Sequence, residues 1–265
     1  DNDTMVVYFY GSYNPNVGFT LLNTTSNVIN GSTVVFNWTS FEYLYDPSMV
    51  LWMHFNNDSS VGENSTHVYD FSGNGNNGTV NGATWTSEGK FGGAFEFNNT
   101  GDRIEIPDSP SWDLPGDNQS LTIMAWIYIK EPLGNKWYLI FCTNSDEYCF
   151  ALRDDGGNNY RPEWWTGTDN YGSSISLSNK TWYHIAVVVD DGNASFYFNG
   201  KLNSSVSYSQ SAKSPTGARI GGYGDSNLFK GFLDEIAIYN RTLSATEILN
   251  HYRLGEGKYY WKVNA

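Results

Sequence analysis

Short runs of alternating apolar and polar residues recur along the chain, separated by clusters of Gly, Asn, Asp and Ser. This alternation, rich in β-branched and aromatic residues, predicts strands rather than helices. The segment ASFYFNGKLNSS contains Asn199-Gly200, the strongest short signal for a hairpin turn. The predicted strands are residues 4–11, 32–40, 49–55, 92–97, 102–106, 120–129, 136–142, 148–153, 181–190, 194–200, 218–222 and 229–240.

A single segment, residues 243–255, has a convincing helical pattern. Ser244 and Glu247 stand three residues apart, as in a capping box, and Gly255 provides a stop. Many strands with one short, late helix indicate an all-β sandwich.

Composition and charge narrow the classes of partner. The 265 residues carry a formal net charge of −13, aromatic residues make up 17%, and no basic run occurs. We therefore expect neither nucleic acid nor anionic lipid to be a partner. The sequence lacks an apolar run of about 18 residues, so we expect no membrane insertion.

Two features predict an exported, extracellular or cell-surface protein, and the opening DNDTMVVYFYG reads as the start of a mature chain after removal of a signal peptide. The first feature is the number of Asn-X-Ser/Thr sequons, which exceeds the chance expectation and predicts N-glycosylation. These sequons are at Asn2, Asn23, Asn30, Asn37, Asn57, Asn64, Asn77, Asn98, Asn118, Asn179, Asn193, Asn203 and Asn240.

The second feature is the pair of cysteines in FCTNSDEYCF. Cys142 and Cys149 flank a polar tip between two apolar runs, so facing positions of a hairpin would bring them within bonding distance. A disulfide is predicted, with two buried thiols as the alternative. No Cys/His cluster supports zinc binding or redox chemistry.

The middle of the chain resembles a known family through six motifs in a fixed order. It is similar to the laminin-G-like jelly roll of the concanavalin A-like superfamily, which implies a domain over residues 47–255. Because this fold hosts many roles, the resemblance says little about function. The motifs are LWMHFNN (51–57), YDFSGNGNNGTVNGATW (69–85), GKFGGAFEFNNTGDRIEIPDS (89–109), SLTIMAWIYI (120–129), TWYHIAVVVDDGNASFYFNGK (181–201) and FKGFLDEIAIYNRTLSATEI (229–248).

The flanking segments resemble pieces of a fibronectin-III-like or immunoglobulin-like domain of prokaryotic, notably archaeal, surface proteins. Residues 1–46 would form a partial unit, and residues 256–265 would supply a strand that completes it, in the same chain or in a neighbouring subunit. Tyr259, Trp261 and Val263 would lie on one face of that strand. Such a domain usually needs about 100 residues, and the two flanking segments together are shorter than that.

A structural calcium ion is implied by the resemblance. A Gly- and Asn-rich turn can aim its carbonyls inward, and calcium takes oxygen ligands. Jelly rolls of this kind often hold calcium at this turn, joined by an acid near the end of the domain. The candidates are Asp70, Asn74, Asn77 and Asp234. The alternative is a tight turn in which Asp70 caps backbone amides.

The sequence offers little for catalysis. Retaining glycosidases need two carboxyl groups about 5–5.5 Å apart, and no run of closely spaced acids on one strand occurs. Asp102 and Glu105 should lie on opposite faces of a strand. His54 and His184 are expected to be satisfied core residues. We therefore expect a protein that is not an enzyme.

A glycan-binding surface is predicted in RPEWWTGTDNYG, residues 161–172. Aromatic rings there alternate with polar groups, and sugars stack on rings while amides and carboxylates hold their hydroxyls. The candidates are Trp164, Trp165, Tyr171 and Asp169. The alternative is that one Trp of the pair points into the core.

Two functions follow from these patterns. The first is a non-enzymatic surface glycoprotein that acts in adhesion or as a subunit of an extracellular filament. Its partner would be a second copy, joined head to tail by strand addition, or another surface protein. The alternative is a lectin-like module that binds polysaccharide.

Overall fold

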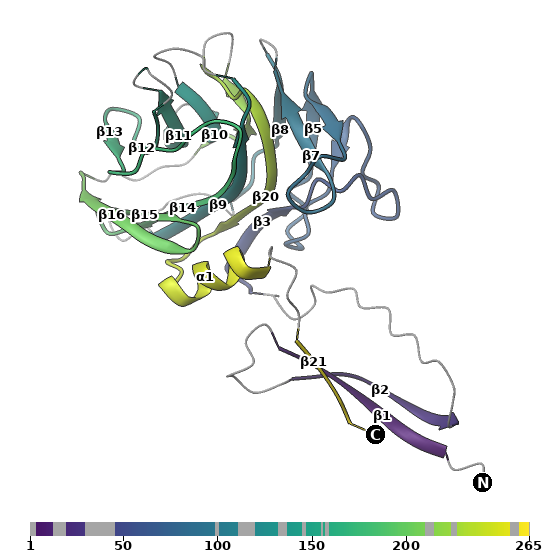
Figure 1. The fold of residues 1–265 in the computed structure, drawn as a ribbon. Helices are drawn as coiled ribbons and strands as arrows, with labels where there is room; N and C mark the ends of the chain where they lie inside the picture. The colour runs from purple at the N-terminus through teal and green to yellow at the C-terminus, as the bar shows by residue number, and fades with distance from the viewer. Residues whose placement is uncertain are drawn as a thin grey trace. The chain divides into compact units, whose positions relative to one another are not determined.

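The chain forms two compact units, and each is described by itself. One unit comprises Asp46–Leu249, and the other combines Asp1–Tyr45 with Asn250–Ala265. Strands dominate the secondary structure, so the all-β prediction is confirmed (Figure 1). The computed structural model describes residues 4–12, 20–29, 46–98, 101–110, 120–131, 137–144, 147–154, 156, 159–209, 215–223, 227–254 and 260–264.

The larger unit is a sandwich of two antiparallel sheets, which we call sheet I and sheet II. Sheet I has the strand order β13-β12-β11-β10-β17-β8-β5-β4. Its strands are β4 (His67–Val68), β5 (Gly78–Asn81), β8 (Arg103–Ile106), β10 (Trp137–Thr143), β11 (Cys149–Asp154), β12 (Tyr160–Trp165), β13 (Asn170–Gly172) and β17 (Ala218–Ile220).

Sheet II has the strand order β16-β15-β14-β9-β20-β7-β6, and β3 also pairs with β20. Its strands are β3 (Met49–Met53), β6 (Thr84–Thr86), β7 (Ala94–Phe97), β9 (Ser120–Ile129), β14 (Trp182–Asp190), β15 (Asn193–Phe198), β16 (Lys201–Ser207) and β20 (Gly231–Tyr239). A small separate ribbon joins β18 (Gly222–Tyr223) to β19 (Asn227–Leu228).

The core fills the space between the two sheets. Alternate residues of each strand point inward, for example Ile123, Ala125 and Ile127 of β9, and all three are fully buried. The facing sheet contributes aromatic residues such as Phe150 and Tyr160. The outer faces differ between the two sheets, and on sheet II outward residues such as Met124, Trp126 and Ala237 are buried as well.

Two local predictions are confirmed. Asn199 and Gly200 both have positive φ, 46° and 76°, as the two-residue hairpin between β15 and β16 requires. Helix α1 (Ala245–Leu254) begins at a capping box. The Ser244 N–H donates to Glu247 Oε2 at 2.7 Å, and the Glu247 N–H donates to Ser244 Oγ at 3.3 Å.

The other unit contains a three-stranded sheet in the order β2-β1-β21. These strands are β1 (Thr4–Ser12), β2 (Thr20–Ile29) and β21 (Tyr260–Asn264). Because β1 and β21 pair antiparallel, with Phe9 opposite Val263, strands from the two ends of the chain meet within one molecule. Trp261 lies in β21, whereas Tyr259 and the predicted strand 32–40 fall outside the described residues.

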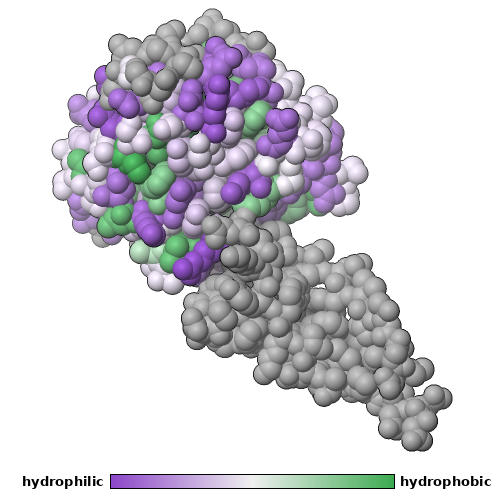
Figure 2. All heavy atoms as spheres, in the orientation of Figure 1, coloured by the Kyte–Doolittle hydropathy of each residue, from purple (hydrophilic) through white to green (hydrophobic). Residues whose placement is uncertain are grey.

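The described surface of the jelly roll mixes hydrophilic and apolar residues without a large continuous apolar area on the face that Figure 2 presents. Among the described residues, Leu202 is the large hydrophobic side chain with high exposure, at 55%. In the same part of the chain, no helix is long and apolar enough to span a membrane.

Candidate functional site

The predicted calcium loop is held by its own hydrogen bonds. Asp70 is buried, and its Oδ1 accepts the N–H groups of Trp52 at 3.0 Å and Ser72 at 2.9 Å. Oδ2 accepts the Ser72 hydroxyl at 2.8 Å and the Asn76 N–H at 2.9 Å. Both carboxylate oxygens therefore accept hydrogen bonds, as expected for a tight turn in which Asp70 caps backbone amides.

The asparagines of this loop also bond to the protein itself. Asn74 Nδ2 donates to the Met49 carbonyl at 2.9 Å, and Asn77 Oδ1 accepts the Asp70 N–H at 2.8 Å. Asn76, which was not a candidate, donates to the Val50 carbonyl at 2.7 Å. Among the described residues no group of three or more His, Cys, Asp or Glu is placed to hold a metal.

As arranged, these groups do not fit a calcium ion, because a calcium ligand must turn an oxygen lone pair toward the ion. The loop is instead fastened to β3 by Asp70 and Asn76. Calcium binding itself stays a prediction.

Asp234, the fourth candidate, is fully buried on β20 and fastens a different loop. Its Oδ2 accepts the Phe91 N–H at 2.9 Å. Burial raises the pKa of Asp234 well above its usual value, and the neighbouring Glu235 carboxylate raises it further. The hydrogen bonds of Asp234 and Asp70 thus lead to separate loops rather than to one ligand set.

The predicted glycan-binding residues are divided between two faces, and the assignment of Trp164 is corrected. Trp164 is 2% exposed, belongs to the core, and stacks on Tyr148 with ring centroids 5.4 Å apart. Its ring cannot meet a sugar. Trp165, the next residue, points to the outer face of sheet I, because successive residues of a strand alternate.

The other two candidates do not join Trp165. Tyr171 is the register partner of Trp164, so it lies on the inner side, and its ring contacts Tyr208 at 5.4 Å. Asp169 is exposed in the turn before β13, and its carboxylate accepts the Thr168 hydroxyl. The four residues therefore form no common sugar-binding surface, although Trp165 remains half-buried and reachable.

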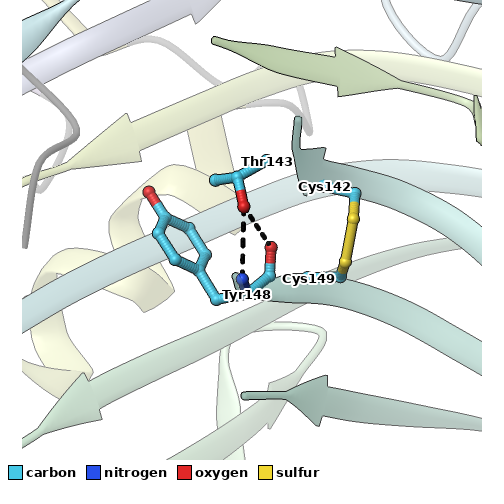
Figure 3. The surroundings of a disulfide bond; sticks show 4 residues. All are labelled: Cys142, Thr143, Tyr148 and Cys149. Carbon is cyan, nitrogen blue, oxygen red and sulfur yellow. Dashed lines mark hydrogen bonds between the residues drawn. A yellow bond between two sulfur atoms is a disulfide. The ribbon is translucent and has the colours of Figure 1, made fainter. Parts of the chain in front are cut away.

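The cysteine prediction is confirmed. Cys142 on β10 and Cys149 on β11 are register partners and form a disulfide. Figure 3 shows the bond beside Thr143, whose hydroxyl contacts both the N–H and the carbonyl of Tyr148 at 3.2 Å. The disulfide lies on the outer face of sheet I, next to Trp165.

The acids and histidines considered for catalysis have structural partners. Asp102 is buried and accepts the Asn98 N–H at 3.0 Å, whereas Glu105 pairs with Arg103 at 2.7 Å. His54 is buried as predicted, and its Nδ1 lies 2.8 Å from the Glu235 carboxylate. His184, also buried, packs against Trp126.

The sequons differ in accessibility, and their occupancy stays a prediction. Asn57, Asn64, Asn98, Asn193, Asn203 and Asn240 are exposed, whereas Asn77 and Asn179 are half-buried. Asn23 lies in β2, and Asn2, Asn30, Asn37 and Asn118 fall outside the described residues.

A row of aromatic side chains on the outer face of sheet II was not predicted. Trp182 on β14 is the register partner of Tyr128 on β9, and Tyr128 is in turn the partner of Phe232 on β20. Between ring centroids, Tyr128 lies 5.6 Å from Trp182 and 5.4 Å from Phe232, and Trp182 lies 6.1 Å from Phe232, so the three rings contact one another. We call these three residues the aromatic row.

Polar side chains lie next to the aromatic row, beside Phe232. Phe232 is the register partner of Glu96, and Glu96 is the partner of the exposed Thr84. The Lys130 ammonium pairs with Glu96 and lies 5.0 Å from the Phe232 ring centroid. The hydrogen bond from Glu96 raises the pKa of Lys130, so this side chain stays charged at neutral pH.

The next outward-facing residues on the same three strands are buried, and they lie beside the aromatic row. Trp126, the partner of His184 and Asp234, is 3% exposed and makes an edge contact with Phe91. The Lys90 ammonium covers the Trp126 ring at 4.3 Å. In contrast, Trp182 and Tyr128 are half-buried, so parts of their rings reach solvent, whereas Phe232 is 5% exposed and packs beside them.

These rings and polar groups are suited to a sugar. The exposed parts of Trp182 and Tyr128 offer apolar surface to C–H groups, while an ammonium and a carboxylate beside them can hold hydroxyls. The signal in the sequence is the placement of Trp182 and Phe232 at strand starts, but only the strand pairing reveals that they meet Tyr128.

Comparison with known families identifies one match. The model described as the Concanavalin A-like lectin/glucanases superfamily matches residues 98–249, more than half of the chain. None of the curated proteins matches the sequence.

Solved structures share this fold at low sequence identity. Domain 4 of AbnA, an extracellular arabinanase from Geobacillus stearothermophilus in complex with arabinotriose, is 19% identical with a TM-score of 0.58, over 77% of this chain and 97% of that one. The binding domain of botulinum neurotoxin serotype G is 20% identical with a TM-score of 0.61, over 79% of this chain and 51% of that one.

A structure of botulinum neurotoxin type C, whose cell entry depends on interaction with two ganglioside molecules, is 14% identical with a TM-score of 0.57. The match covers 80% of this chain and 52% of that one. The chain therefore spans about half the length of the toxin domains and nearly all of the arabinanase domain.

Proposed function

Because the chain belongs to the concanavalin A-like lectin and glucanase superfamily, we propose that it is a non-catalytic carbohydrate-binding protein of the cell exterior. The aromatic row carries this proposal. Its rings lie on the outer face of sheet II, parts of Trp182 and Tyr128 reach solvent, and the Lys130–Glu96 pair borders them.

The similar structures support the same class of ligand. The arabinanase domain was solved with arabinotriose, and the type C neurotoxin interacts with gangliosides. Both ligands are carbohydrates or carry them. The aromatic row is the described surface of this chain best suited to stack on such a ligand.

A binding assay with matched variants tests the proposal. We expect the purified protein to bind at least one member of a neutral oligosaccharide panel that includes arabinotriose. Trp182→Ala and Tyr128→Ala should each weaken that binding about tenfold or more, which corresponds to about 1.4 kcal/mol. Isothermal titration calorimetry measures the dissociation constants.

Trp165→Ala is the matched control, since it removes a half-buried indole from the opposite sheet. It should leave the affinity for neutral sugars within about twofold. Equal losses for Trp182→Ala and Trp165→Ala, or no binding to any neutral sugar, would contradict the proposal.

Absence of catalysis is part of the proposal and has its own test. Glu96, the acid beside the aromatic row, is paired with Lys130, and Glu235 on β20 is paired with His54, which argues against a free acid and base there. We expect no new reducing ends after long incubation with the polysaccharides that bind. Release of reducing ends would show instead that the chain is a glycosidase.

An extracellular location fits the chemistry of the chain. A disulfide and exposed sequons are features of exported proteins. Peptide mapping of protein purified from its native source should find glycans at some of the exposed sequons. Unmodified asparagines throughout would remove this support.

A second candidate function is assembly through strand addition, and the strand order β2-β1-β21 favours it. Within the described part of the smaller unit, β2 and β21 each pair on one side only, so both offer an edge to another chain. Exchange of β21 between chains would join subunits head to tail and give adhesive fibres.

A cysteine pair distinguishes the two arrangements of β21. Phe9 and Val263 are register partners, so Phe9→Cys with Val263→Cys should form a disulfide within one chain if β21 folds back, and between chains if it is exchanged. Non-reducing electrophoresis separates monomers from ladders. Removal of residues 258–265 should abolish polymers and leave the jelly roll folded, and polymers that survive would contradict strand exchange.

A further inference from the structure

Two edge strands of five or more residues occur in the described part of the jelly roll, β3 and β16. β3 pairs with β20 alone, and β16 ends the strand order of sheet II (Figure 1). The other terminal strands of the two sheets, β4, β6 and β13, have two or three residues each. An edge strand presents unpaired N–H and C=O groups to which another chain can add, and long exposed edges are most prone to such pairing.

The free side of β3 is covered by the loop that contains Asp70. The Trp52 N–H donates to Asp70 Oδ1 at 3.0 Å, and the Trp52 carbonyl accepts the Phe71 N–H at 2.8 Å. Two residues earlier on the strand, the Val50 carbonyl accepts Asn76 Nδ2 at 2.7 Å. The loop therefore occupies the backbone groups with which a strand of another molecule would pair.

β16 has no comparable cover. Five of its seven residues are exposed, among them Leu202 at 55%. In the part of the chain that the structure describes, the backbone of β16 pairs with β15, and no hydrogen bond reaches its free side. Lys201, at the first position, is its single charged residue. Charge is one of the usual protections of an edge strand, and here it is confined to one end.

Two of the exposed sequons lie at this edge. Asn203 belongs to β16, and Asn193 begins β15 opposite Ser207, the last residue of β16. The register shifts between Phe196 and Tyr197 and leaves Asn203 without a partner on β15. Asn203 is therefore the extra residue of a β-bulge, at a point where the regular pairing of the edge is already interrupted.

The hydrogen bonds of both asparagines use the carbonyl oxygen of the side chain. Asn203 Oδ1 accepts the hydroxyls of Ser174 at 3.0 Å and Ser204 at 3.1 Å, and Asn193 Oδ1 accepts the Ser207 hydroxyl at 2.8 Å. An N-linked sugar is attached to Nδ2 and leaves Oδ1 as an acceptor. All three hydrogen bonds can therefore persist when the two asparagines are glycosylated.

The two sequons flank the edge from different sides. Asn203 bonds to Ser174, which follows β13, so it lies on the side of sheet I. Asn193 precedes the core residue Ala194, so its side chain starts on the outer side of sheet II. Along β16 the two positions are separated by four residues, about 13 Å at about 3.3 Å per residue. Two bulky, hydrated sugar chains at these positions would obstruct an approaching strand.

We propose that N-linked oligosaccharides at Asn193 and Asn203 cover the free edge of β16 and prevent the jelly roll from pairing edge to edge with a second copy. At each site Nδ2 loses a proton and bonds to the anomeric carbon of a lipid-phosphate-linked oligosaccharide from the secreting cell, and the bond from that carbon to phosphate breaks. The inference rests on the glycosylation included in the proposed function and is independent of sugar binding at the aromatic row.

Sedimentation velocity of the full chain, secreted by a host that glycosylates Asn-X-Ser/Thr, tests the inference. Asn193→Gln/Asn203→Gln should sediment as larger species than the unchanged protein at the same concentration. Addition of Leu202→Lys to this double variant should restore the sedimentation of the unchanged protein, because like charges would then meet across the paired edges. Circular dichroism should show that all variants remain folded.

The matched control is Ser59→Ala/Asn240→Gln, which removes the sequons of Asn57 and Asn240, neither of which lies on an edge strand. It should sediment like the unchanged protein. Equal sedimentation of the two double variants, or association that Leu202→Lys does not reduce, would overturn the inference.

Peptide mapping of protein from its native source should find glycans at both Asn193 and Asn203. An unmodified Asn203 beside glycans at other sequons would overturn the inference and leave the proposed extracellular location intact. Neutral-sugar binding is not a readout in these experiments, so a failure of the aromatic row to bind sugar would not be mistaken for a failure at this edge.

Discussion

The outer faces of sheet I and sheet II differ in chemistry although the two sheets share one core. Sheet I presents four arginines, two half-buried indoles and the disulfide. Sheet II presents no arginine on its strands, and instead carries the aromatic row with a single Lys–Glu pair beside it. Inward positions of both sheets are alike, being apolar and buried.

This difference separates what the fold requires from what it permits. Inward residues must fill a common space, so their chemistry is fixed by packing. Outward residues that stay partly exposed, such as Trp165 on sheet I and Trp182 and Tyr128 on sheet II, carry less of this requirement, so the two faces can differ in chemistry. A variant on one outer face should therefore change the properties of that face only. An effect on the opposite face would contradict this separation.

The largest effect is expected where the inner and outer sides of one strand are compared. Trp164→Ala should lower the free energy of unfolding by about 3–5 kcal/mol, because it empties a core position. Trp165→Ala, one residue along β12, should cost about 1 kcal/mol. Guanidinium denaturation followed by circular dichroism measures both, and equal losses would contradict the assignment of the two faces.

Removal of the disulfide should have the next largest effect and remain confined to sheet I. Cys142→Ala/Cys149→Ala should lower the free energy of unfolding by about 2–3 kcal/mol, through the added freedom of the unfolded chain. Neutral-sugar affinity at the aromatic row should not change. A loss of that affinity would mean that the two outer faces are coupled.

A moderate effect is expected at the loop fastened to sheet II by Asp70. Asp70→Asn replaces an acceptor by a donor opposite backbone N–H groups and should cost about 1–3 kcal/mol in stability. Thermal unfolding with and without EDTA tests the metal separately. A melting temperature that EDTA lowers and calcium restores would confirm the predicted ion, since a bound ligand stabilises the folded state by mass action, and an unchanged melting temperature would contradict it.

The smallest effect is expected at the cap of α1, which follows the last strand of sheet II. The hydrogen bond with Arg241, together with those from Ser244, holds the pKa of Glu247 at about 2, below its ordinary value of 4.5. Its stabilisation is therefore present above about pH 4.5 and lost as the pH falls through about 2.

Glu247→Gln should cost about 0.5–1 kcal/mol near neutral pH, since the carboxylate is partly exposed and solvent weakens its ion pair. Urea denaturation at several pH values should show the difference between the two proteins vanish below about pH 2. A difference that persists in acid would mean that the carboxylate charge does not contribute.

Much of the fold could be predicted because its signals are local. The Asn199-Gly200 turn and the Ser244/Glu247 cap depend on residues a few positions apart. β12 was missed because Pro162 and polar residues interrupt its alternation, and β16 because most of its residues on either face are polar. Strands of two or three residues, such as β4 and β13, are too short to show a period.

The candidate sites could be predicted only in part, because they are made by strand pairing. Trp164 and Trp165 look like one surface in the sequence, yet the alternation of a strand sends them to opposite faces. Tyr128, Trp182 and Phe232 are far apart in the chain, and only the register of β14, β9 and β20 brings them together. The Asp70 turn was located correctly, but the direction of its hydrogen bonds could not be read from composition.

The antiparallel pairing of β1 with β21 has a mechanical consequence. The outermost register pair, Tyr8 with Asn264, lies where β21 ends, and the intervening chain runs through the whole jelly roll. Tension applied to the two ends would peel these strands apart one pair at a time, beginning there. As long as the last pair, Ser12 with Tyr260, holds, the load bypasses both large sheets and leaves them undistorted.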